Sequence, residues 1–400
     1  MSDCGNSLFK AVLFRRDNPA LTGCFPIIYD FRANKLKHMS DTLVKPKVHN
    51  YSAGPCILPQ EVFQQASQAV LEYNGTGLSI LEMSHRSKEI VAMAENAISL
   101  VKETLNVPAG YSVLFLQGGA SLQFYMSALN LLSENGTAGY IDTGAWSSKA
   151  IKEAKRIGNI EVLASSKDKN YNYIPKGFDI PTGLDFLHYT TNNTIYGTEF
   201  FSTPKTDAVL VADMSSDIFS RPINVADYGL IYAGAQKNLG PAGVTLAIIK
   251  DELLGKNEGL PSMLDYKIHA DKDSMFNTPP VYSIYVSMLT LEWLKKNGGV
   301  SWIDKRNQQK ADFLYGEIDR NALFTGTAET EDRSRMNATF VLNDESQTDE
   351  FNKLLAEANI SGLKGHRSVG GFRASMYNAM PVESVQVLVD VMKELERTRG

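Results

Sequence analysis

The sequence predicts an α/β fold, with a large domain built on a mostly parallel sheet between layers of helices and a smaller α+β domain after it. Two observations indicate this fold. Between about residues 60 and 250, short apolar runs typical of buried strands alternate with segments of helical periodicity. From about Val300 the alternation stops, and a long helical segment leads into a mixture of shorter helices and strands. With 400 residues and 43% hydrophobic content, the chain has enough apolar material for two or more domains.

The elements of the large domain follow one another in a regular order. Residues 60–73 and 90–105 carry apolar side chains three or four positions apart, which predicts amphipathic helices. The apolar run at 112–117 predicts a buried strand. The elements expected after it are a helix at 122–132, a strand at 138–142, a helix at 148–157, and strands at 186–190, 208–212, 229–234 and 244–250.

The smaller domain is predicted from the last quarter of the chain. Its expected elements are a long helix at 302–318, a strand at 336–342, a helix near 350–358, a strand at 372–376 and a final helix from Val382.

Composition excludes several classes of function. Forty Lys and Arg stand against 45 Asp and Glu, and a net charge of −5 gives no general attraction for nucleic acid. No run approaches the ~18 apolar residues of a membrane span. The three cysteines all lie in the first sixth of the chain, which supports neither a disulfide framework nor a metal site. We therefore expect a cytoplasmic protein without metal, nucleic-acid or membrane partners.

Residues 1–46 have two interpretations. They are either a poorly ordered extension or the product of an upstream start codon, with the working start at Met39. The second is favoured, because Met39 begins a short polar lead directly before the segments from Asn50 that are described below. Residues 8–14 are too short, and too soon interrupted by Lys10, for a secretory signal.

Lys237 is the residue that most strongly indicates a chemistry. It lies in a turn of small residues, Ala233–Gly243, just after an apolar run. About two dozen residues upstream, Asp213 ends another apolar run. An accessible lysine and a buried acid at this spacing suggest pyridoxal phosphate, with the lysine forming a Schiff base and the acid pairing with the pyridinium nitrogen. The alternative is a surface lysine in a turn and an aspartate that caps a helix.

A glycine-rich turn upstream is a candidate phosphate site. Gly118-Gly119-Ala120-Ser121 follows a predicted strand and opens a predicted helix, so free backbone N–H groups and the helix dipole favour an anion there. Taken alone, the motif is weak evidence, and it is more typical of an ordinary helix N-terminus.

From Asn50 to the C-terminus the chain resembles the phosphoserine aminotransferases, which are class V enzymes of fold-type I. The matching segments lie in family order over about 350 residues, at 50–55, 83–86, 118–121, 213–216, 234–237, 274–280 and 364–373. The resemblance implies a seven-stranded type of sheet in a large pyridoxal-phosphate-binding domain at 65–300. It implies a small domain made of residues 47–64 and 301–400, and a homodimer with shared active sites.

The resemblance also implies a set of cofactor contacts. Lys237 and Asp213 are the catalytic pair, Thr194 hydrogen-bonds the pyridoxal 3-hydroxyl, and Trp146 stacks on the ring. The phosphate contacts are Ala120, Ser121 and Gln236, with Asn277 and Thr278 reaching the cofactor of the other subunit. Ser121 departs from the family, which often has a bulkier, basic residue at this position.

The substrates implied are phosphoserine and 2-oxoglutarate, giving 3-phosphohydroxypyruvate and glutamate in serine biosynthesis. A phosphorylated hydroxythreonine of pyridoxine biosynthesis is a further substrate of the family. Both pairs require cations for a carboxylate and for a second anionic group. The matching residues are His85, Arg86, His366, Arg367 and Arg373.

Three alternative functions remain to be weighed. A cysteine desulfurase needs a late nucleophilic cysteine, and no cysteine follows Cys56. An aminotransferase of serine, alanine or glyoxylate does not require the cations at 366, 367 and 373. A regulatory module that only binds the cofactor needs a DNA-binding domain, and residues 1–46 show no such pattern.

Overall fold

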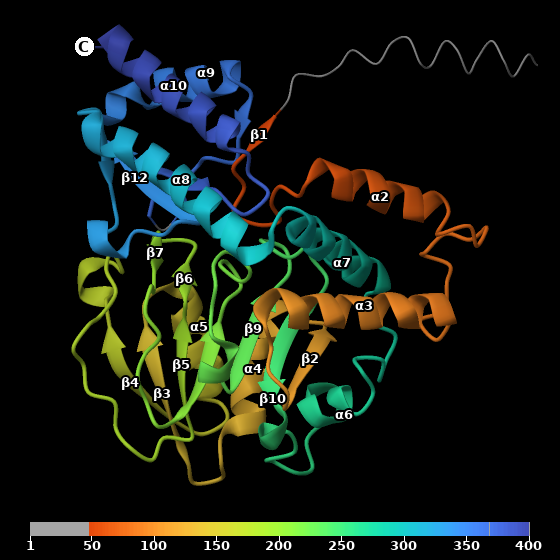
Figure 1. Cartoon of the computed structure of the whole chain (residues 1–400). Helices are drawn as coiled ribbons and strands as arrows, with labels where there is room; N and C mark the ends of the chain where they lie inside the picture. The colour runs from red at the N-terminus through yellow and green to blue at the C-terminus, as the bar shows by residue number, and fades with distance from the viewer. Residues whose placement is uncertain (1–47, 368, 400) are drawn as a thin grey trace, which may run out of the picture. The chain divides into compact units, whose positions relative to one another are not determined.

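The computed structural model describes residues 48–367 and 369–399 of the chain. The expectations about residues 1–46 lie outside this range. Figure 1 shows a large sheet with helices on both sides, and a smaller sheet with its own helices. Among the described residues, no helix is both long and apolar enough to cross a membrane.

The large sheet has seven strands in the order β2-β10-β9-β8-β5-β3-β4. Six strands run parallel, and β10 runs antiparallel to both of its neighbours. The mostly parallel sheet predicted from the sequence is therefore confirmed. The strands are β2 (Tyr111–Leu116), β3 (Thr137–Asp142), β4 (Asn159–Ser165), β5 (Phe186–Thr190), β8 (Val209–Asp213), β9 (Leu230–Gly234) and β10 (Thr245–Lys250).

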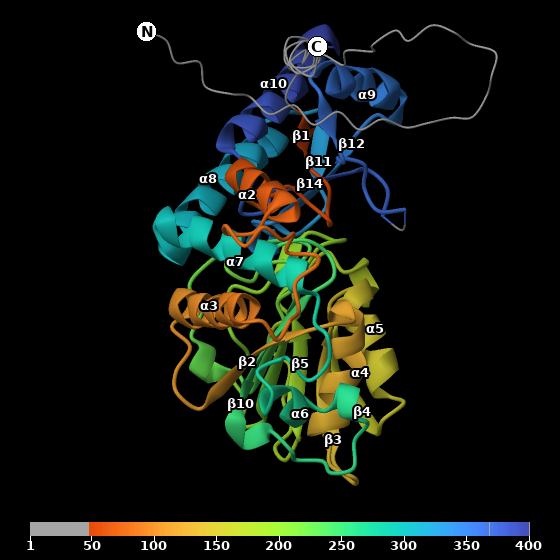
Figure 2. The same cartoon turned by 90° about the vertical axis from the view of Figure 1, so that its right-hand side faces the viewer.

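Successive residues of the sheet face two different hydrophobic layers. On β2, Val113 and Phe115 pack with the helices α2, α3 and α7, whereas Leu114 and Leu116 pack with α4, α5 and α6. Figure 2 shows α3 on one side of the sheet and α4 and α5 on the other. The helices are α2 (Gln60–Leu71), α3 (Lys88–Leu105), α4 (Gly119–Leu131), α5 (Ala145–Ala154), α6 (Tyr266–Ala270) and α7 (Val281–Lys296). Burial on both faces explains why these strands read as continuous apolar runs.

The C-terminal part builds a second, antiparallel sheet of three strands in the order β11-β12-β14. A separate core cluster joins it to three helices. The N-terminal strand β1 (His49–Asn50) pairs with β13 (Ile360–Ser361) beside this core. The other elements are α8 (Gly299–Arg320), α9 (Thr348–Glu357), α10 (Val382–Arg399), β11 (Phe324–Gly326), β12 (Asn337–Leu342) and β14 (Phe372–Ser375). A domain division into 65–300 on one side and 47–64 with 301–400 on the other stays a proposal.

Candidate active site

The strands of the large sheet bring their polar ends to one edge. Leu116 and Gly234 both pair with Thr245 of the antiparallel β10, so β2 and β9 end together. Asp213, the last residue of β8, pairs with Thr190 of β5 and with Tyr232 of β9. Residues that follow these strands are therefore neighbours although they are far apart in the sequence, as is usual at the carboxyl edge of a parallel sheet.

A cavity of about 300 Å³ lies at this edge. It brings together nine of the residues that the sequence singled out: Ala120, Ser121, Trp146, Thr194, Asp213, Gln236, Lys237, His366 and Arg373. They come from the last residues of five different strands or the segments just after them, and from the C-terminal part of the chain. A single cavity thus contains the candidate lysine, its acid and two of the candidate cations.

Five other candidates do not line this cavity. Arg86, Arg367 and Thr278 are exposed, His85 is buried, and Asn277 is half-buried beside Gln117 in a small separate hollow. The structure of one chain therefore leaves these candidates outside the cavity around its own lysine.

Lys237 lies in a tight turn directly after β9. Its backbone N–H donates to the carbonyl of Ala235 at 2.7 Å, and the N–H of Gly240 donates to the same carbonyl at 2.7 Å. Its side chain points into the cavity, where Nζ donates to Thr194 Oγ1 at 2.8 Å. Burial lowers the pKa of Lys237 to about 8, with Asp213 opposing this shift and Arg373 adding to it. The amine is therefore far more readily neutral than an exposed lysine.

Asp213 is held as a buried acid at the end of β8. Its Oδ1 accepts hydrogen bonds from the backbone N–H of Ser215 at 2.9 Å and from Ser215 Oγ at 2.6 Å. Ser215 Oγ also accepts from the N–H of Gly234, which ties the carboxylate to β9. Burial raises the pKa of Asp213, while the bonds from Ser215 and the charge of Lys237 oppose the rise. A cationic partner in the cavity would favour the ionised carboxylate.

The N-terminus of α4 opens onto the same cavity. Gly118 precedes the helix with φ of 86°, and Gly119, Ala120 and Ser121 form its first turn. No acidic residue lies in that turn, so the free N–H groups and the dipole are available to an anion.

The opposite side of the cavity is basic. Arg373 Nη1 donates to the carbonyl of Thr194 at 3.3 Å, which aims the guanidinium at the Lys237 side of the cavity. Burial, with the charges of Arg373, Arg367 and Lys149, lowers the pKa of His366. These groups act on one another electrostatically, so the structure brings Arg367 near the cavity although it does not line it.

Three buried polar atoms of residues that line the cavity help to judge whether pyridoxal phosphate fits into it. Trp146 Nε1, Thr190 Oγ1 and Arg373 Nε have no hydrogen-bond partner among the described residues. Buried polar atoms normally have hydrogen-bond partners, so the lack of partners for these three atoms indicates that the cavity binds a polar ligand. The helix N-terminus suits a phosphate, Asp213 suits a protonated ring nitrogen and Lys237 suits an aldehyde. The residues present therefore fit this cofactor.

Sequence reasoning gave no role to several residues that line the cavity, and three of them shape its geometry. Ser215 lies two positions after Asp213 and forms an Asx turn with it, a pattern that Asp-x-Ser could have indicated. Gly54 lines the cavity with φ of 136°, and a Cβ there would meet Lys237 Cγ at 3.3 Å. Thr190 is the last residue of β5, and its hydroxyl gave no signal within an apolar strand.

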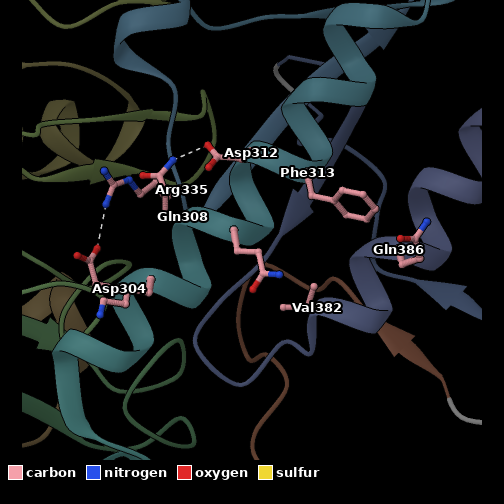
Figure 3. Close-up of a pocket in the computed structure, with 9 residues that line it drawn as sticks. Asp304, Gln308, Asp312, Phe313, Arg335, Val382 and Gln386 are labelled. Atoms are coloured by element: carbon pink, nitrogen blue, oxygen red, sulfur yellow. Dashed lines mark hydrogen bonds and ion pairs between the residues drawn. The ribbon is translucent and has the colours of Figure 1, made fainter.

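A larger groove of about 770 Å³ lies between α8 and α10. Figure 3 shows two pairs among its polar groups, Gln308 with Asp312, and Arg335 with Asp304, where Arg335 Nη1 donates at 2.9 Å. It contains none of the residues that the sequence singled out. Size alone is therefore a poor guide here, and the smaller cavity around Lys237 is the candidate active site.

Comparisons with known proteins agree with this assignment. The family described as class V aminotransferase matches residues 48–388. A phosphoserine aminotransferase of Flavobacterium psychrophilum is 61% identical over 352 residues, covering 88% of this chain and 99% of the relative. The solved structure of the enzyme from Bacillus circulans is 44% identical with a TM-score of 0.86, over 88% of this chain and 99% of that one. The pyridoxal-phosphate-bound enzyme from Trichomonas vaginalis is 35% identical with a TM-score of 0.83, over 87% and 100%. The chain therefore belongs to the class V aminotransferases and, within them, to the phosphoserine aminotransferase family.

Proposed function

We propose that this protein catalyses the reversible transfer of an amino group between O-phospho-L-serine and 2-oxoglutarate, giving 3-phosphohydroxypyruvate and L-glutamate. The observation that carries the proposal is the single cavity in which Lys237, Asp213, the N-terminus of α4, the imidazole of His366 and the guanidinium of Arg373 meet. The relatives named above, similar over nearly their whole length, support the same reaction.

The cofactor is pyridoxal phosphate, which when bound supplies an aldehyde that takes up an amino group and a ring that accepts the electrons of the substrate's Cα–H bond. Asp213 would keep the ring nitrogen protonated, because a buried carboxylate beside a cation favours the charged pair. Ala120, Ser121 and Gln236 would hold the phosphate, with backbone N–H groups of α4 contributing where Ser121 brings no positive charge. Trp146 would lie against the ring, and Thr194 would bind its 3-oxygen.

Lys237 would carry the proton transfers. Because its pKa is lowered to about 8, Nζ is neutral far more often near physiological pH than the amine of an exposed lysine, and the neutral amine can accept the proton of the substrate's α-carbon. Thr194 Oγ1, 2.8 Å from Nζ, holds the amine on the cavity side of the turn. Nζ of Lys237 can then return the proton as a general acid.

The basic side of the cavity would hold the substrate's anionic groups. Arg373 presents a guanidinium, whose planar fork suits a carboxylate, next to Lys237. His366 and Arg367, on the loop between β13 and β14, would bind the distal phosphate of phosphoserine or the distal carboxylate of 2-oxoglutarate. The phosphorylated hydroxythreonine of pyridoxine biosynthesis carries the same pair of anionic groups and would be accepted as well.

A homodimer would complete the site. Asn277, Thr278, His85 and Arg86 lie outside the cavity of their own chain, and a second copy would bring them to it. Exposed apolar side chains in the segment that precedes Arg86 favour a contact surface there, since Leu71 is 77% exposed and Leu81 is 63% exposed. We also propose that the enzyme is cytoplasmic, because its substrates are small charged metabolites.

A direct comparison of amino donors tests the function. Phosphoserine, serine and alanine are offered to the holoenzyme at equal concentration with 2-oxoglutarate, and glutamate formation is measured. We expect phosphoserine to react at least about 100-fold faster, because unpaired cations in the pocket penalise a donor that lacks the distal anion. Comparable rates for the three donors would favour a general aminotransferase of small amino acids.

A further inference from the structure

Residues 218–220 form a buried turn shortly after Asp213. Phe219 in this turn is 2% exposed and has a φ of 60°, a left-handed conformation that is rare for a bulky aromatic residue. No backbone N–H among the described residues donates to the three carbonyls of the turn. A conformation of this kind costs free energy and persists only where surrounding contacts impose it. Side chains from elsewhere in the chain must therefore hold the turn in its shape.

Each of the three carbonyls accepts a hydrogen bond from the side-chain amide of a different asparagine, and each of these bonds is 3.0 Å long. The donor and acceptor pairs are Asn238 with Ile218, Asn378 with Phe219, and Asn307 with Ser220. These three asparagines, here called the asparagine ladder, are at most 5% exposed. They come from the lysine turn, from the segment after β14 and from α8. Three distant parts of the chain thus converge on one turn.

Two further hydrogen bonds join the asparagines to one another. The backbone N–H of Asn378 donates to Asn238 Oδ1 at 3.0 Å, and Asn307 Nδ2 donates to Asn378 Oδ1 at 2.9 Å. A backbone N–H can only donate and a backbone carbonyl can only accept, so these partners fix which way the amides of Asn238 and Asn378 are turned. The ladder is therefore one connected network rather than three separate contacts.

The ladder connects the segments that carry the two catalytic candidates. Asn238 directly follows Lys237 in the tight turn after β9. Its partner Ile218 donates from its backbone N–H to the carbonyl of Met214 at 2.9 Å, and Met214 directly follows Asp213. Through Asn238, the backbone that carries the lysine is fixed to the backbone that carries the acid.

The helix α8 holds the other end of the ladder. One helical turn after Asn307, the fully buried Lys310 donates from Nζ to the carbonyls of Met376 and Tyr377, both at 2.8 Å. Burial of an amine has a large free-energy cost, and these two bonds offset part of it. Asn307 and Lys310 thus bind three successive residues, of which Asn378 is the last. The C-terminal core therefore contacts the lysine turn through a segment that is itself firmly held.

We propose that Asn238 is a positioning residue for the transamination, which keeps the Lys237 turn against the Asp213 segment, and that Asn378 and Asn307 hold Asn238 in its place. The proposal rests on the proposed function. None of the three asparagines lines the cavity, so they would act only through the backbone of the lysine turn. Proton transfer requires a precise distance between the amine and the reacting carbon, and a displacement of about 1 Å can reduce a rate about 100-fold.

The first test measures Lys237 without any turnover. Full-length protein stripped of cofactor is treated with trace acetic anhydride between pH 6 and pH 11, and acetylation of the Lys237 peptide is followed by mass spectrometry. Burial is the main cause of the lowered pKa of Lys237, so Asn238→Ala, which releases the turn towards water, should raise the midpoint by about one pH unit. An unchanged midpoint overturns the proposal. The charged groups that face Lys237 are the same in all variants: Asp213, Asp217, Arg373 and Cys56.

Two further variants test whether the ladder acts as one unit. Asn378→Ala alone should raise the midpoint, but in the Asn238→Ala background it should add less than about 0.2 units, because its route to the lysine is already cut. A full additional shift in that background would contradict an action through Asn238. If Asn238→Ala fails to fold, Asn307→Ala leaves the lysine turn intact and its midpoint must rise as well; no change would overturn the proposal.

Asn130→Ala is the matched control. Asn130 is 4% exposed, and its Nδ2 donates to the carbonyls of Met126 and Leu264 at 2.8 and 2.7 Å, so it also joins distant segments. It lies near the end of α4 that is farther from the cavity and lines no part of it. Asn130→Ala should lower the melting temperature about as much as Asn238→Ala and leave the midpoint of Lys237 unchanged. An equal shift of the midpoint in this variant would show general loosening of the fold and overturn the proposal.

Kinetics of the holoenzyme give an independent readout. Asn238→Ala should lower kcat about 10- to 100-fold and leave KM for phosphoserine within about twofold, since Asn238 does not line the cavity. Asn130→Ala should leave both within about twofold. A raised KM with an unchanged kcat in Asn238→Ala would contradict a positioning role for proton transfer. A wild-type enzyme without phosphoserine activity would refute the proposed function, and the acetylation test would still decide whether the ladder positions Lys237.

Discussion

Replacing Asp213 by Asn removes one charge from the candidate site and keeps the shape of the side chain. Asp213 is 4% exposed, and its Oδ1 is held by two bonds from Ser215. The variant should bind pyridoxal phosphate more weakly, because an amide cannot keep the ring nitrogen protonated. A charge-assisted hydrogen bond is worth about 1.5–3 kcal/mol against about 1 kcal/mol for a neutral one, so the dissociation constant should rise about 10-fold. Turnover should fall about 100- to 1,000-fold further, the usual effect of removing one preorganised electrostatic partner.

The same substitution should not weaken the fold. Burial raises the pKa of Asp213, which means that folding disfavours its charge, and Asn removes that penalty. A group whose pKa rises on folding loses stability as pH increases from its ordinary value of 3.8 through the folded value, so the variant should be more stable relative to the wild type at pH 7 than at pH 4. The free energy of unfolding of the cofactor-free protein, measured in urea at both values, checks this.

Asp185, directly before β5 at the opposite end of that strand, is the matched control. Burial alone would raise its pKa, but hydrogen bonds from Ser133 and Lys256 lower it. Asp185→Asn should therefore reduce the free energy of unfolding by about 1–2 kcal/mol and leave cofactor affinity within about twofold. Weaker cofactor binding in both variants, or in neither, would refute the role given to Asp213.

Three further predictions concern the same cavity. Lys237→Met should abolish turnover. It should also raise the free energy of unfolding of the cofactor-free protein at pH 7 by up to about 3 kcal/mol, because a lysine whose pKa is lowered to about 8 destabilises the folded state below pH 8. In urea titrations this gain should vanish towards pH 10.5, and a difference that does not depend on pH would contradict the prediction. Gly54→Ala should weaken cofactor binding, because a φ of 136° strains any other residue by about 1–3 kcal/mol and the Cβ of the alanine would press on Lys237. Gly259→Ala is the control: Gly259 also has a positive φ, 71°, but no atom lies near its added Cβ, so cofactor binding should be unchanged. Arg367→Ala should raise KM for phosphoserine at least about 10-fold with unchanged cofactor affinity in a spectroscopic titration, and an unaltered KM would remove it from the substrate pocket.

The large sheet was predictable because its strands are buried on both faces. The apolar run at 186–190 coincides with β5, and β8, β9 and β10 begin and end within one residue of their expected bounds. β4 was missed for the opposite physical reason. It is an edge strand that pairs only with β3, and most of its residues are exposed or half-buried, so it has no apolar run. Its strand conformation depends on a neighbour that local sequence cannot reveal.

The residues of the candidate site also fall into those that the sequence indicates and those that it does not. Lys237, Asp213 and the α4 turn follow apolar strands in sequence, so their chemistry and their place at the sheet edge could be inferred together. Gly54 carries no such signal. It reaches the lysine through a contact between distant segments, in which Cys56, two residues after it, donates from Sγ to the backbone carbonyl of Lys237.

The proton affinity of Lys237 shows most clearly where sequence reasoning stops. The identity of the lysine follows from its turn, but its pKa is set by opposing effects: burial and Arg373 lower it, and Asp213, Asp217 and Cys56 raise it. These charges come from segments up to about 320 residues apart, and their sum depends on distances of a few ångströms. Without this burial the lysine would keep a pKa nearer its ordinary value and would be neutral far more rarely at pH 7. Packing of the C-terminal core against the lysine turn therefore determines whether the chemistry that the sequence indicates can take place.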